Sequence, residues 1–409
     1  MPSKKHLAGF VAAFSVILGS LAMTTPLYAA SSEQVLYAFQ GGKSDGLEPL
    51  AGVMFDSSGN LYGTTYEGGF YNGGIVFELT PNNGQWTEKV HTFQPKYGEK
   101  PKAGLIMDSA GNLYGTTYYG GAYGYGTVFE LTPNNGEWAF KVLHAFINNG
   151  KDGLDPTAGL VFDAAGNLYG TTALGGSSNL GTLFKLTLNN GKWIYKVLHS
   201  FSGKDDVNQP QAALIFDTAG NLYGTTYGTV FELTPSGGKW TEKVLHKFKH
   251  NGYDGYACVA SLIFDTAGNL YGTTFYGGAD SSCNDFTGCG TVFELIPNNG
   301  KWTEKLLHSF HDKGDGAFPL AGLIFDAAGN LYGTTGGGGL TGDGSGVVFE
   351  LTPHGSNWTE TVLYAFSVNG RSDGGGPTAG LIFDKAGNLY STTEDGGGTN
   401  NGVVFEVTP

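Results

Sequence analysis

Apolar residues after position 34 occur in short runs separated by polar and glycine-rich segments. In the first repeating unit four such runs follow one another, namely AGVMFD (51–56), NLYGTT (60–65), GIVFELT (74–80) and WTEKVHTF (86–93). They are rich in aromatic and β-branched residues and are bounded by turn residues, which is typical of β-strands. No stretch of this region shows the apolar spacing of an amphipathic helix. The pattern predicts an all-β protein.

The four runs recur seven times. The string GNLYGTT marks the second run of each copy, and the last copy departs from it with Ser391 in place of the second glycine. The copies begin at Gly59, Gly111, Gly166, Gly220, Gly268, Gly329 and Gly387. Successive copies start 48 to 61 residues apart, a period that indicates a solenoid, a propeller or an array. Four strands per repeat match a propeller blade, whereas a β-helix coil uses roughly half this period.

The two ends of the repeat region complement each other. The last repeat stops after its third run, at 403–409, and a run of the fourth type, VLYAF at 35–39, precedes the first repeat. The same five letters recur at 362–366. We expect the amino-terminal strand to complete the last blade and close the ring, which removes the open sheet edges. The prediction is a seven-bladed β-propeller of four-stranded blades, built by residues 31–409 as a single domain.

The repeated signature AGLIFDxxGNLYGTT…GTVFELTP resembles the GloVer tandem repeat, which occurs in the "choice-of-anchor" family of bacterial secreted proteins. The resemblance extends over residues 35–409. It implies an extracellular repeat protein and supplies no catalytic residues. The strand pattern is also similar to that of NHL-type propellers, and this likeness implies that the segments equivalent to AGLIFD line the central channel.

The amino terminus has the layout of a secretory signal peptide. Lys4 and Lys5 form a basic start, an apolar run covers 7–22, and the small residues Ala29 and Ala30 follow. This arrangement predicts a signal peptide over residues 1–30, with an uncleaved membrane anchor as the alternative. No later segment is apolar enough to cross a bilayer, so we expect a mature protein without a membrane span, secreted, extracellular or periplasmic.

Charge narrows the range of partners. Lysine and arginine number 22, aspartate and glutamate 36, and the net charge is −14. The chain therefore lacks the basic surface that binds nucleic acid or an anionic membrane. We expect a monomer without a cofactor that binds carbohydrate or an exported or surface protein.

The loops between the second and third strands vary most. They hold 11 residues in repeats one, two, three and seven, but 4, 18 and 13 in repeats four, five and six. Alternating strand directions place them on one face together with the loops between blades, so this face is the expected binding surface. Its aromatic residues suit sugar rings or extended peptides, although some could instead pack between blades. They are Tyr66, Phe70, Tyr71, Tyr118, Tyr119, Tyr123, Tyr125, Phe275 and Tyr276.

Aspartates followed by glycine recur in the loops between blades. Asp45, Asp152 and Asp373 belong to this set and are candidate ligands on the same face. Carboxylates and carbonyls there could hold calcium, but capping of the Asp-Gly turn explains them as well. No calcium-binding loop spacing is present.

Histidines recur on the fourth strand at positions 91, 144, 199, 246 and 308. Tyrosine fills the same place at positions 37 and 364, so we expect these histidines to be structural. Two further histidines lie in consecutive loops between blades, each near an acid, which makes a weak candidate for a metal or acid–base site at the central mouth. That set is His250, Asp254, His311 and Asp315.

The three cysteines all fall in repeat five. Cys283 and Cys289 lie in its long loop and are the preferred disulfide pair, which export favours. Cys258 precedes the first strand at the same end of the blade and could pair with either of them. No zinc-binding spacing supports a site of three cysteines.

Three functions remain open. The first is a secreted scaffold that binds a polysaccharide, a surface glycan or an exported protein through the variable face. The second is a propeller lyase or hydrolase with its site in the central mouth. The third is a structural protein of the cell envelope. No nucleophile elbow, metalloprotease helix or phosphate-binding loop occurs in its required context.

Overall fold

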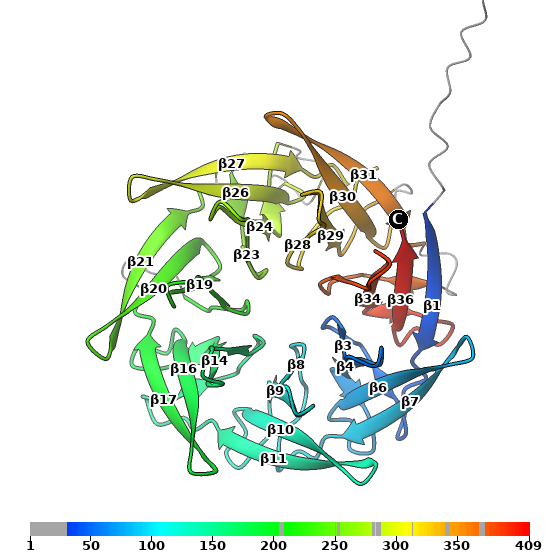
Figure 1. Cartoon of the computed structure of the whole chain (residues 1–409), viewed down its shortest axis with the longest axis vertical. Coiled ribbons are helices and arrows are strands. Elements are labelled where there is room, and N and C mark those ends of the chain that lie inside the picture. The colour runs from blue at the N-terminus through cyan, green and yellow to red at the C-terminus, as the bar shows by residue number, and fades with distance from the viewer. Residues whose placement is uncertain are drawn as a thin grey trace, which may run out of the picture. The chain divides into compact units, whose positions relative to one another are not determined.

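The computed structural model describes residues 31–409 except 204–207, 250, 252–253, 280–282, 284–287, 313, 340–343 and 368–372. Seven four-stranded antiparallel sheets are arranged in a ring (Figure 1). The predicted all-β fold with seven blades is therefore confirmed. The segment predicted as a signal peptide, residues 1–30, lies outside the described residues. Among the residues that are described, no helix is long and apolar enough to span a membrane.

Each blade runs from a two-residue innermost strand to a long outermost strand. In blades one to three the strands are β3 (Met54–Phe55), β4 (Leu61–Thr65), β6 (Ile75–Asn82) and β7 (Gln85–Thr92); β8 (Ile106–Met107), β9 (Leu113–Thr117), β10 (Thr127–Asn134) and β11 (Glu137–Ala145); and β13 (Val161–Phe162), β14 (Leu168–Thr172), β16 (Thr182–Asn189) and β17 (Lys192–Ser200). In blades four to six they are β18 (Ile215–Phe216), β19 (Leu222–Thr225), β20 (Thr229–Ser236) and β21 (Lys239–Lys247); β23 (Ile263–Phe264), β24 (Leu270–Thr274), β26 (Thr291–Asn298) and β27 (Lys301–Ser309); and β28 (Ile324–Phe325), β29 (Leu331–Thr335), β30 (Val347–His354) and β31 (Asn357–Ala365).

The seventh blade joins the two ends of the chain. It consists of β33 (Ile382–Phe383), β34 (Leu389–Thr393), β36 (Val403–Thr408) and β1 (Ser32–Ala38). Strand β1 pairs with β36 from Ser32 opposite Thr408 to Ala38 opposite Val403. The predicted closure of the ring by the amino-terminal strand is thus confirmed, and β1 lies beside β36 at the right of Figure 1.

Short two-stranded ladders extend four of the blades beyond the second strand. They are β2 (Gly46–Leu47) with β5 (Glu67–Gly68), β12 (Gly153–Leu154) with β15 (Leu174–Gly175), β22 (Gly255–Tyr256) with β25 (Tyr276–Gly277), and β32 (Gly374–Gly375) with β35 (Asp395–Gly396). Each ladder joins the loop that enters a blade to the loop that leaves its second strand. This pairing fixes the backbone on the face where the variable loops lie.

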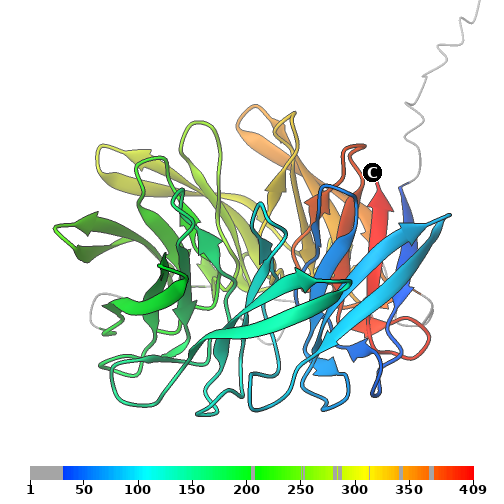
Figure 2. The same ribbon diagram turned by 60° about the horizontal axis from the view of Figure 1, so that its bottom comes forward.

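The antiparallel order of the strands divides the loops between two faces. The tight hairpins between strands one and two and between strands three and four share one face, which points upward in Figure 2. The loops between strands two and three and those between blades share the other, along the lower edge of that view. We call this second face the variable face.

Pairs of phenylalanines hold neighbouring blades together. The phenylalanine that follows each fourth strand packs edge-to-face on the phenylalanine of the next blade's third strand, as Phe146 does on Phe184 with ring centroids 5.4 Å apart. All seven junctions have this contact, at 5.1 to 5.4 Å. Rings in this geometry add to the stability that comes from burial. The repeated VFE and Phe-ending runs of the sequence therefore form the contacts between blades.

The second strand is buried over its whole length because blades cover it on both sides. Its central glycine is required by a close approach: a Cβ at Gly63 would lie 2.4 Å from the ring of Phe77 on the neighbouring strand. The hairpin before it is fixed by Asp56, which accepts hydrogen bonds from the backbone amides of Ser58 and Asn60 at 2.8 and 2.9 Å. These contacts explain why the motif Asp-x-x-Gly-Asn-Leu-Tyr-Gly is repeated so closely.

Candidate functional site

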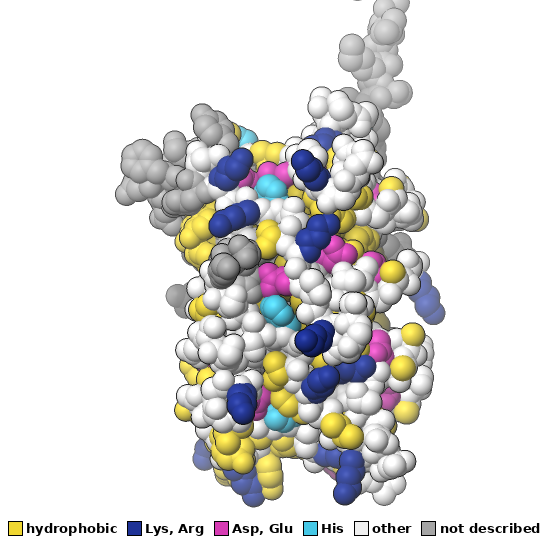
Figure 3. Space-filling view, turned by 90° about the vertical axis from the view of Figure 1, so that its left-hand side faces the viewer, with side chains coloured by type: hydrophobic (Ala, Val, Ile, Leu, Met, Phe, Trp, Pro, Cys, Tyr) yellow, Lys and Arg dark blue, Asp and Glu magenta, His cyan; other side chains and the backbone are white. Residues whose placement is uncertain are grey.

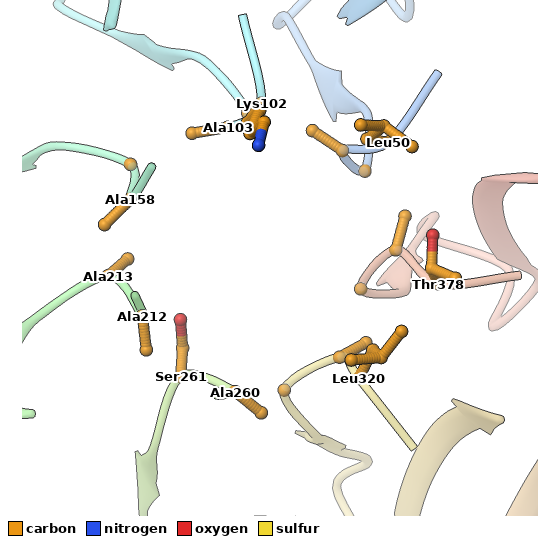
Figure 4. A pocket seen from close by; sticks show the side chains of 18 of the residues that line it. Leu50, Lys102, Ala103, Ala158, Ala212, Ala213, Ala260, Ser261, Leu320 and Thr378 are labelled. Atoms are coloured by element: carbon orange, nitrogen blue, oxygen red, sulfur yellow. The ribbon is translucent and has the colours of Figure 1, made fainter. Parts of the chain in front are cut away.

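The central channel is lined by the innermost segments of all seven blades. It encloses a cavity of about 380 Å³, and small side chains, mainly alanines and glycines, form most of its wall (Figure 4). The segments equivalent to AGLIFD lie here, as the likeness to NHL-type propellers implied. The polar side chains on the wall are Lys102, Thr157, Gln211, Ser261 and Thr378. Among the described lining residues there is no histidine, aspartate or glutamate.

A ring of strained backbone surrounds the channel on the variable face. In six of the seven loops between blades, the residue three positions before the channel-lining alanine has φ between 55° and 63°, although none of the six is glycine. The six are Glu48, Lys100, Asp155, Gln209, Ala257 and Phe318, and Gly376 with φ 62° completes the ring. Six of these residues accept a hydrogen bond on their carbonyl from the residue after the GNLYGTT motif of the same repeat, as Glu48 does from Tyr66 at 2.9 Å; the six are Glu48, Lys100, Asp155, Ala257, Phe318 and Gly376. We call this set the mouth ring.

The mouth ring combines one backbone shape with different side chains. Side chains at positive φ cost stability, because the left-handed region crowds Cβ. Such positions cluster at functional sites, where the surrounding structure holds them in place. Sequence reasoning missed the mouth ring. The signal that would have found it is a variable residue immediately before the proline that starts six of the seven channel segments, for example Pro101 and Pro156.

One side of the mouth, at blades seven, one and two, is charged. Lys102 lies over the ring of Tyr118 with its Nζ 3.8 Å from the centroid and 5.6 Å from that of Tyr66. Lys100 pairs with Glu67 and also lies 4.9 Å from the Tyr66 ring. Burial lowers the pKa of Lys102, an effect that Asp155 opposes. We call this region the charged sector.

Acidic groups complete the charged sector. Burial, together with the charges of Glu67 and Asp395, raises the pKa of Glu48. Burial also raises the pKa of Glu394, and Asp395 and Glu48 add to the effect. Carboxylates and ammonium groups therefore lie close together across adjacent blades, with tyrosine faces between them. None of these charged residues was singled out from the sequence.

The opposite side of the mouth, at blades four to six, is aromatic. Five partly buried rings contact one another there: Tyr227, Tyr256, Phe275, Tyr276 and Phe318. Tyr256 and Tyr276 are cross-strand partners in the β22–β25 ladder, with nearly parallel rings 6.5 Å apart. Phe275 and Phe318 lie 5.1 Å apart. We call this group the aromatic sector; two of its members, Phe275 and Tyr276, were predicted and three were not.

The other predicted aromatic residues divide into three groups. Phe70, Tyr71, Tyr119 and Tyr123 are exposed by 58, 49, 41 and 55%. Tyr66 and Tyr118 lie in the charged sector. Tyr125 instead packs against the buried cluster of blades two and three, which is the alternative that the sequence left open.

The aspartates of the Asp-Gly turns lie away from the channel, at the outer wall. Asp45 and Asp152 are each 6% exposed, and their carboxylates accept hydrogen bonds from the backbone of their own turns. The same carboxylates bond to the fourth strand: Asp45 to the Tyr37 hydroxyl at 3.1 Å and Asp152 to His144 Nε2 at 3.0 Å. Asp373 accepts from the Tyr364 hydroxyl at 2.9 Å. Turn capping explains these aspartates, and they do not line the channel mouth.

The candidate acid–base set is not assembled at the mouth. Asp315 bonds to His308 Nε2 at 3.0 Å and to His311 Nδ1 at 3.3 Å, and Asp254 lies beside His246 on β21. His250 lies outside the described residues. The placement of Asp254, His311 and Asp315 at a central site was wrong, because each loop between blades starts at the outermost strand and its aspartate caps that outer end.

The fourth-strand histidines and tyrosines therefore belong to the contacts between blades. His144 stacks on Tyr195 of the next blade with centroids 3.6 Å apart, and His91 on Phe140 at 5.2 Å. Histidine beside acidic side chains recurs along the outer wall in Figure 3. The structural role expected for these residues agrees with the contacts of His91 and His144.

The cysteines of blade five have different roles. Cys283 and Cys289 form a disulfide with an S–S distance of 2.07 Å, which is the predicted pair. Cys258 is free and fully buried. It occupies the position that proline has in the other six channel segments, for example Pro319.

Solved structures with the same fold are distant in sequence. The chain aligns with the extracellular domain of a protein named as a hybrid two component system from B. thetaiotaomicron at a TM-score of 0.55 and 13% identity, covering 90% of this chain. It spans only 39% of that chain's length. A protein named as a 6-phosphogluconolactonase from Bacteroides fragilis gives 0.55 and 13%, covering 86% and 97% of the two chains, and a protein from Lactobacillus plantarum gives 0.53 and 13%, covering 80% and 86%. At this identity the likeness shows the propeller fold alone.

Sequence comparison gives a closer relationship. No curated protein matches the chain. The model of the Gloeobacter/Verrucomicrobia repeat matches residues 23–227 and again 226–409, which together include all seven repeats. This chain belongs to the Gloeobacter/Verrucomicrobia repeat family.

Proposed function

We propose that this propeller is an exported carbohydrate-binding module whose site is the channel mouth on the variable face. The observation that carries the proposal is the aromatic sector. Five rings that are neither fully buried nor fully exposed contact one another on the variable face at blades four to six. Sugar rings bind aromatic faces through their C–H surfaces, while their hydroxyls bond to polar groups nearby.

The charged sector supplies the polar half of the proposed site. Glu48 and Glu394 offer acceptors for sugar hydroxyls, and Lys100 and Lys102 offer donors. Lys102 is held between tyrosine faces, so little side-chain freedom would be lost on binding. The two sectors lie on opposite sides of the mouth, which fits a chain of several sugars better than a single ring.

Export is the second part of the proposal. The basic and apolar segments of residues 1–30 support it, as does the Cys283–Cys289 disulfide, since such bonds persist mainly outside the cytoplasm. Amino-terminal sequencing of the protein collected from the culture medium or periplasm tests it. We expect the mature chain to begin at Ser31; a chain that stays inside the cell with residues 1–30 attached contradicts export.

A glycan array followed by calorimetry with the best oligosaccharide tests the binding site. Aromatic anchors at binding sites typically cost about 2 kcal/mol when truncated, so Tyr256→Ala and Tyr276→Ala should each weaken binding at least about tenfold. The matched control is Ile194→Ala, which removes a side chain 52% exposed on the outer wall strand β17. An array without hits, or an equal loss in the control, contradicts the proposal.

A further inference from the structure

The junctions between blades repeat one arrangement of three side chains at the outer wall. The first comes from the fourth strand of one blade, the second is the aspartate of the following loop, and the third comes from the fourth strand of the next blade. At the junction of blades four and five these are His246 on β21, Asp254 just before β22, and Glu304 on β27. All three have potential ligand atoms within 4.8 Å of one another.

At four other junctions the tyrosine or histidine bonds directly to the aspartate of the loop. The Tyr37 hydroxyl bridges Asp45 and Glu88 at 3.1 and 2.8 Å. His144 Nε2 lies 3.0 Å from Asp152, and its ring is covered by Tyr195, which replaces the glutamate. These distances are those of ordinary hydrogen bonds.

The junction of blades four and five is open by comparison. His246 Nε2 lies 3.8 Å from Asp254 Oδ1 and 3.6 Å from Glu304 Oε2, both longer than a hydrogen bond. His246 Nε2, Asp254 Oδ1 and Glu304 Oε1 are buried atoms without a hydrogen-bond partner. The Asp254 side chain is only 10% exposed. Buried polar atoms are nearly always satisfied, so an unsatisfied atom on each of three neighbouring side chains indicates a missing partner.

We propose that His246, Asp254 and Glu304 bind a divalent transition metal ion, with Zn²⁺ as the best match. Two ligands at about 2.1 Å from a tetrahedral ion lie about 3.4 Å apart, so side-chain movements of a few tenths of an ångström would close the observed gaps. One imidazole and two carboxylates favour zinc or a related ion, whereas calcium requires 6–8 oxygen ligands. The ion would replace the mutual hydrogen bonds of the other junctions and connect β21 to β27.

Burial and neighbouring charges change the pKa values of the groups at this site. Burial and the Asp254 charge raise the pKa of Glu304 to about 8, and Lys249 opposes this. Burial lowers the pKa of His246, which keeps its imidazole neutral, as a ligand must be. The buried Cys258 thiol also lies within the field of Glu304, and burial raises its pKa.

The test is equilibrium dialysis and calorimetry of the metal-depleted protein with ZnCl₂. We expect one zinc per chain and an increase in melting temperature, because the ion binds the folded protein. His246→Tyr copies the natural Tyr37 junction and should keep the fold while weakening zinc binding at least about tenfold; Glu304→Gln should do the same. The matched controls, His308→Tyr and Glu360→Gln, change the next junction, where His308 already bonds to Asp315.

The outcomes separate clearly. No zinc bound by the unmodified protein, or equal weakening in the variants and the controls, overturns the proposal. Loss of zinc in both His246→Tyr and Glu304→Gln, with circular dichroism spectra unchanged and the controls within about twofold, supports it. Calcium in place of ZnCl₂ should leave the melting temperature unchanged; a stabilisation by calcium that exceeds that by zinc would also overturn it.

Discussion

The phenylalanine junctions and the mouth ring both repeat seven times around the propeller. The junctions keep the same side chain in every repeat, whereas the mouth ring keeps the same backbone conformation and varies the side chain. At the junctions the same ring pair recurs with centroids between 5.1 and 5.4 Å. In the mouth ring the same backbone recurs with φ between 55° and 63°, but the side chains range from glutamate and lysine to glutamine and phenylalanine. The side chain is repeated where it packs against the next blade, and in the mouth ring only the backbone conformation is repeated.

Side-chain packing fixes the junction phenylalanines, whereas backbone hydrogen bonds fix the mouth ring. A buried phenylalanine contacts two blades, so any change in its volume disturbs the packing of both. A mouth-ring residue is fixed through its backbone hydrogen bonds, so its side chain can change while the fold persists. The predictions below begin with the contacts that hold the ring together and end with the mouth ring.

Removal of Ser31–Gln40 should have the largest effect. It deletes β1, leaves β36 with an unpaired edge, and removes Phe39 from its contact with Phe77. An exposed edge strand invites aggregation, so we expect loss of cooperative melting and association visible by size-exclusion chromatography. Addition of a synthetic peptide of residues 31–40 should restore part of the lost stability by completing the sheet. An unchanged melting curve would contradict ring closure by β1.

Truncation of one junction ring should come next. Phe146 is fully buried against Phe184, and Phe-to-Ala changes in cores cost about 3–5 kcal/mol. Phe146→Ala should lower the free energy of unfolding by that amount, measured by denaturant titration. Phe70→Ala is the control, because Phe70 is 58% exposed on the variable face, and it should change stability by less than about 0.5 kcal/mol. Similar costs for both would show that the junction rings do not hold the blades.

Much of the fold, but only part of the candidate site, could be predicted from the sequence. Strand order, blade number and closure could be predicted because GNLYGTT and VFE repeat in register and VLYAF occurs twice. The direction of the loops followed from alternating strands. Asp254 and Asp315 were misplaced because a loop between blades runs from the outer wall to the centre, and spacing does not say where along that path a residue stops. Lys102 and Tyr256 were missed since neither belongs to a motif, and only the assembled ring brings them to the mouth.

The outer junctions should make stability fall as pH rises. Burial and the Asp315 charge raise the pKa of Glu360 to about 8, from an ordinary value of 4.5. Since the folded state holds this proton more tightly than the unfolded chain, the stabilisation is full below about pH 4.5 and is lost as the pH rises through about 8. Glu360→Gln should match the unmodified protein at pH 5 and melt about 2 °C higher at pH 9, measured by calorimetry with a chelator present. A variant that melts lower at pH 9 would show that the carboxylate is paired and stabilising there.

The smallest effect should come from the mouth ring, and it has the opposite sign. Gln209 has φ 63°, a conformation that glycine adopts freely. Relief of strain exceeds the added entropy of the unfolded chain, so Gln209→Gly should stabilise the protein by about 0.5–1 kcal/mol.

The reciprocal change is available at Gly376, which has φ 62° and room for a methyl group, with the nearest atoms 3.8 Å away or more. Gly376→Ala should therefore destabilise the protein by a similar amount, about 1 kcal/mol, through backbone strain alone. Paired denaturant titrations check both changes. If Gln209→Gly raises stability and weakens oligosaccharide binding, the strained side chains of the mouth ring are retained for recognition, since the fold would be more stable without them. If Gln209→Gly destabilises the protein, its side chain contributes to folding, and the contrast between junctions and mouth ring does not hold at that position.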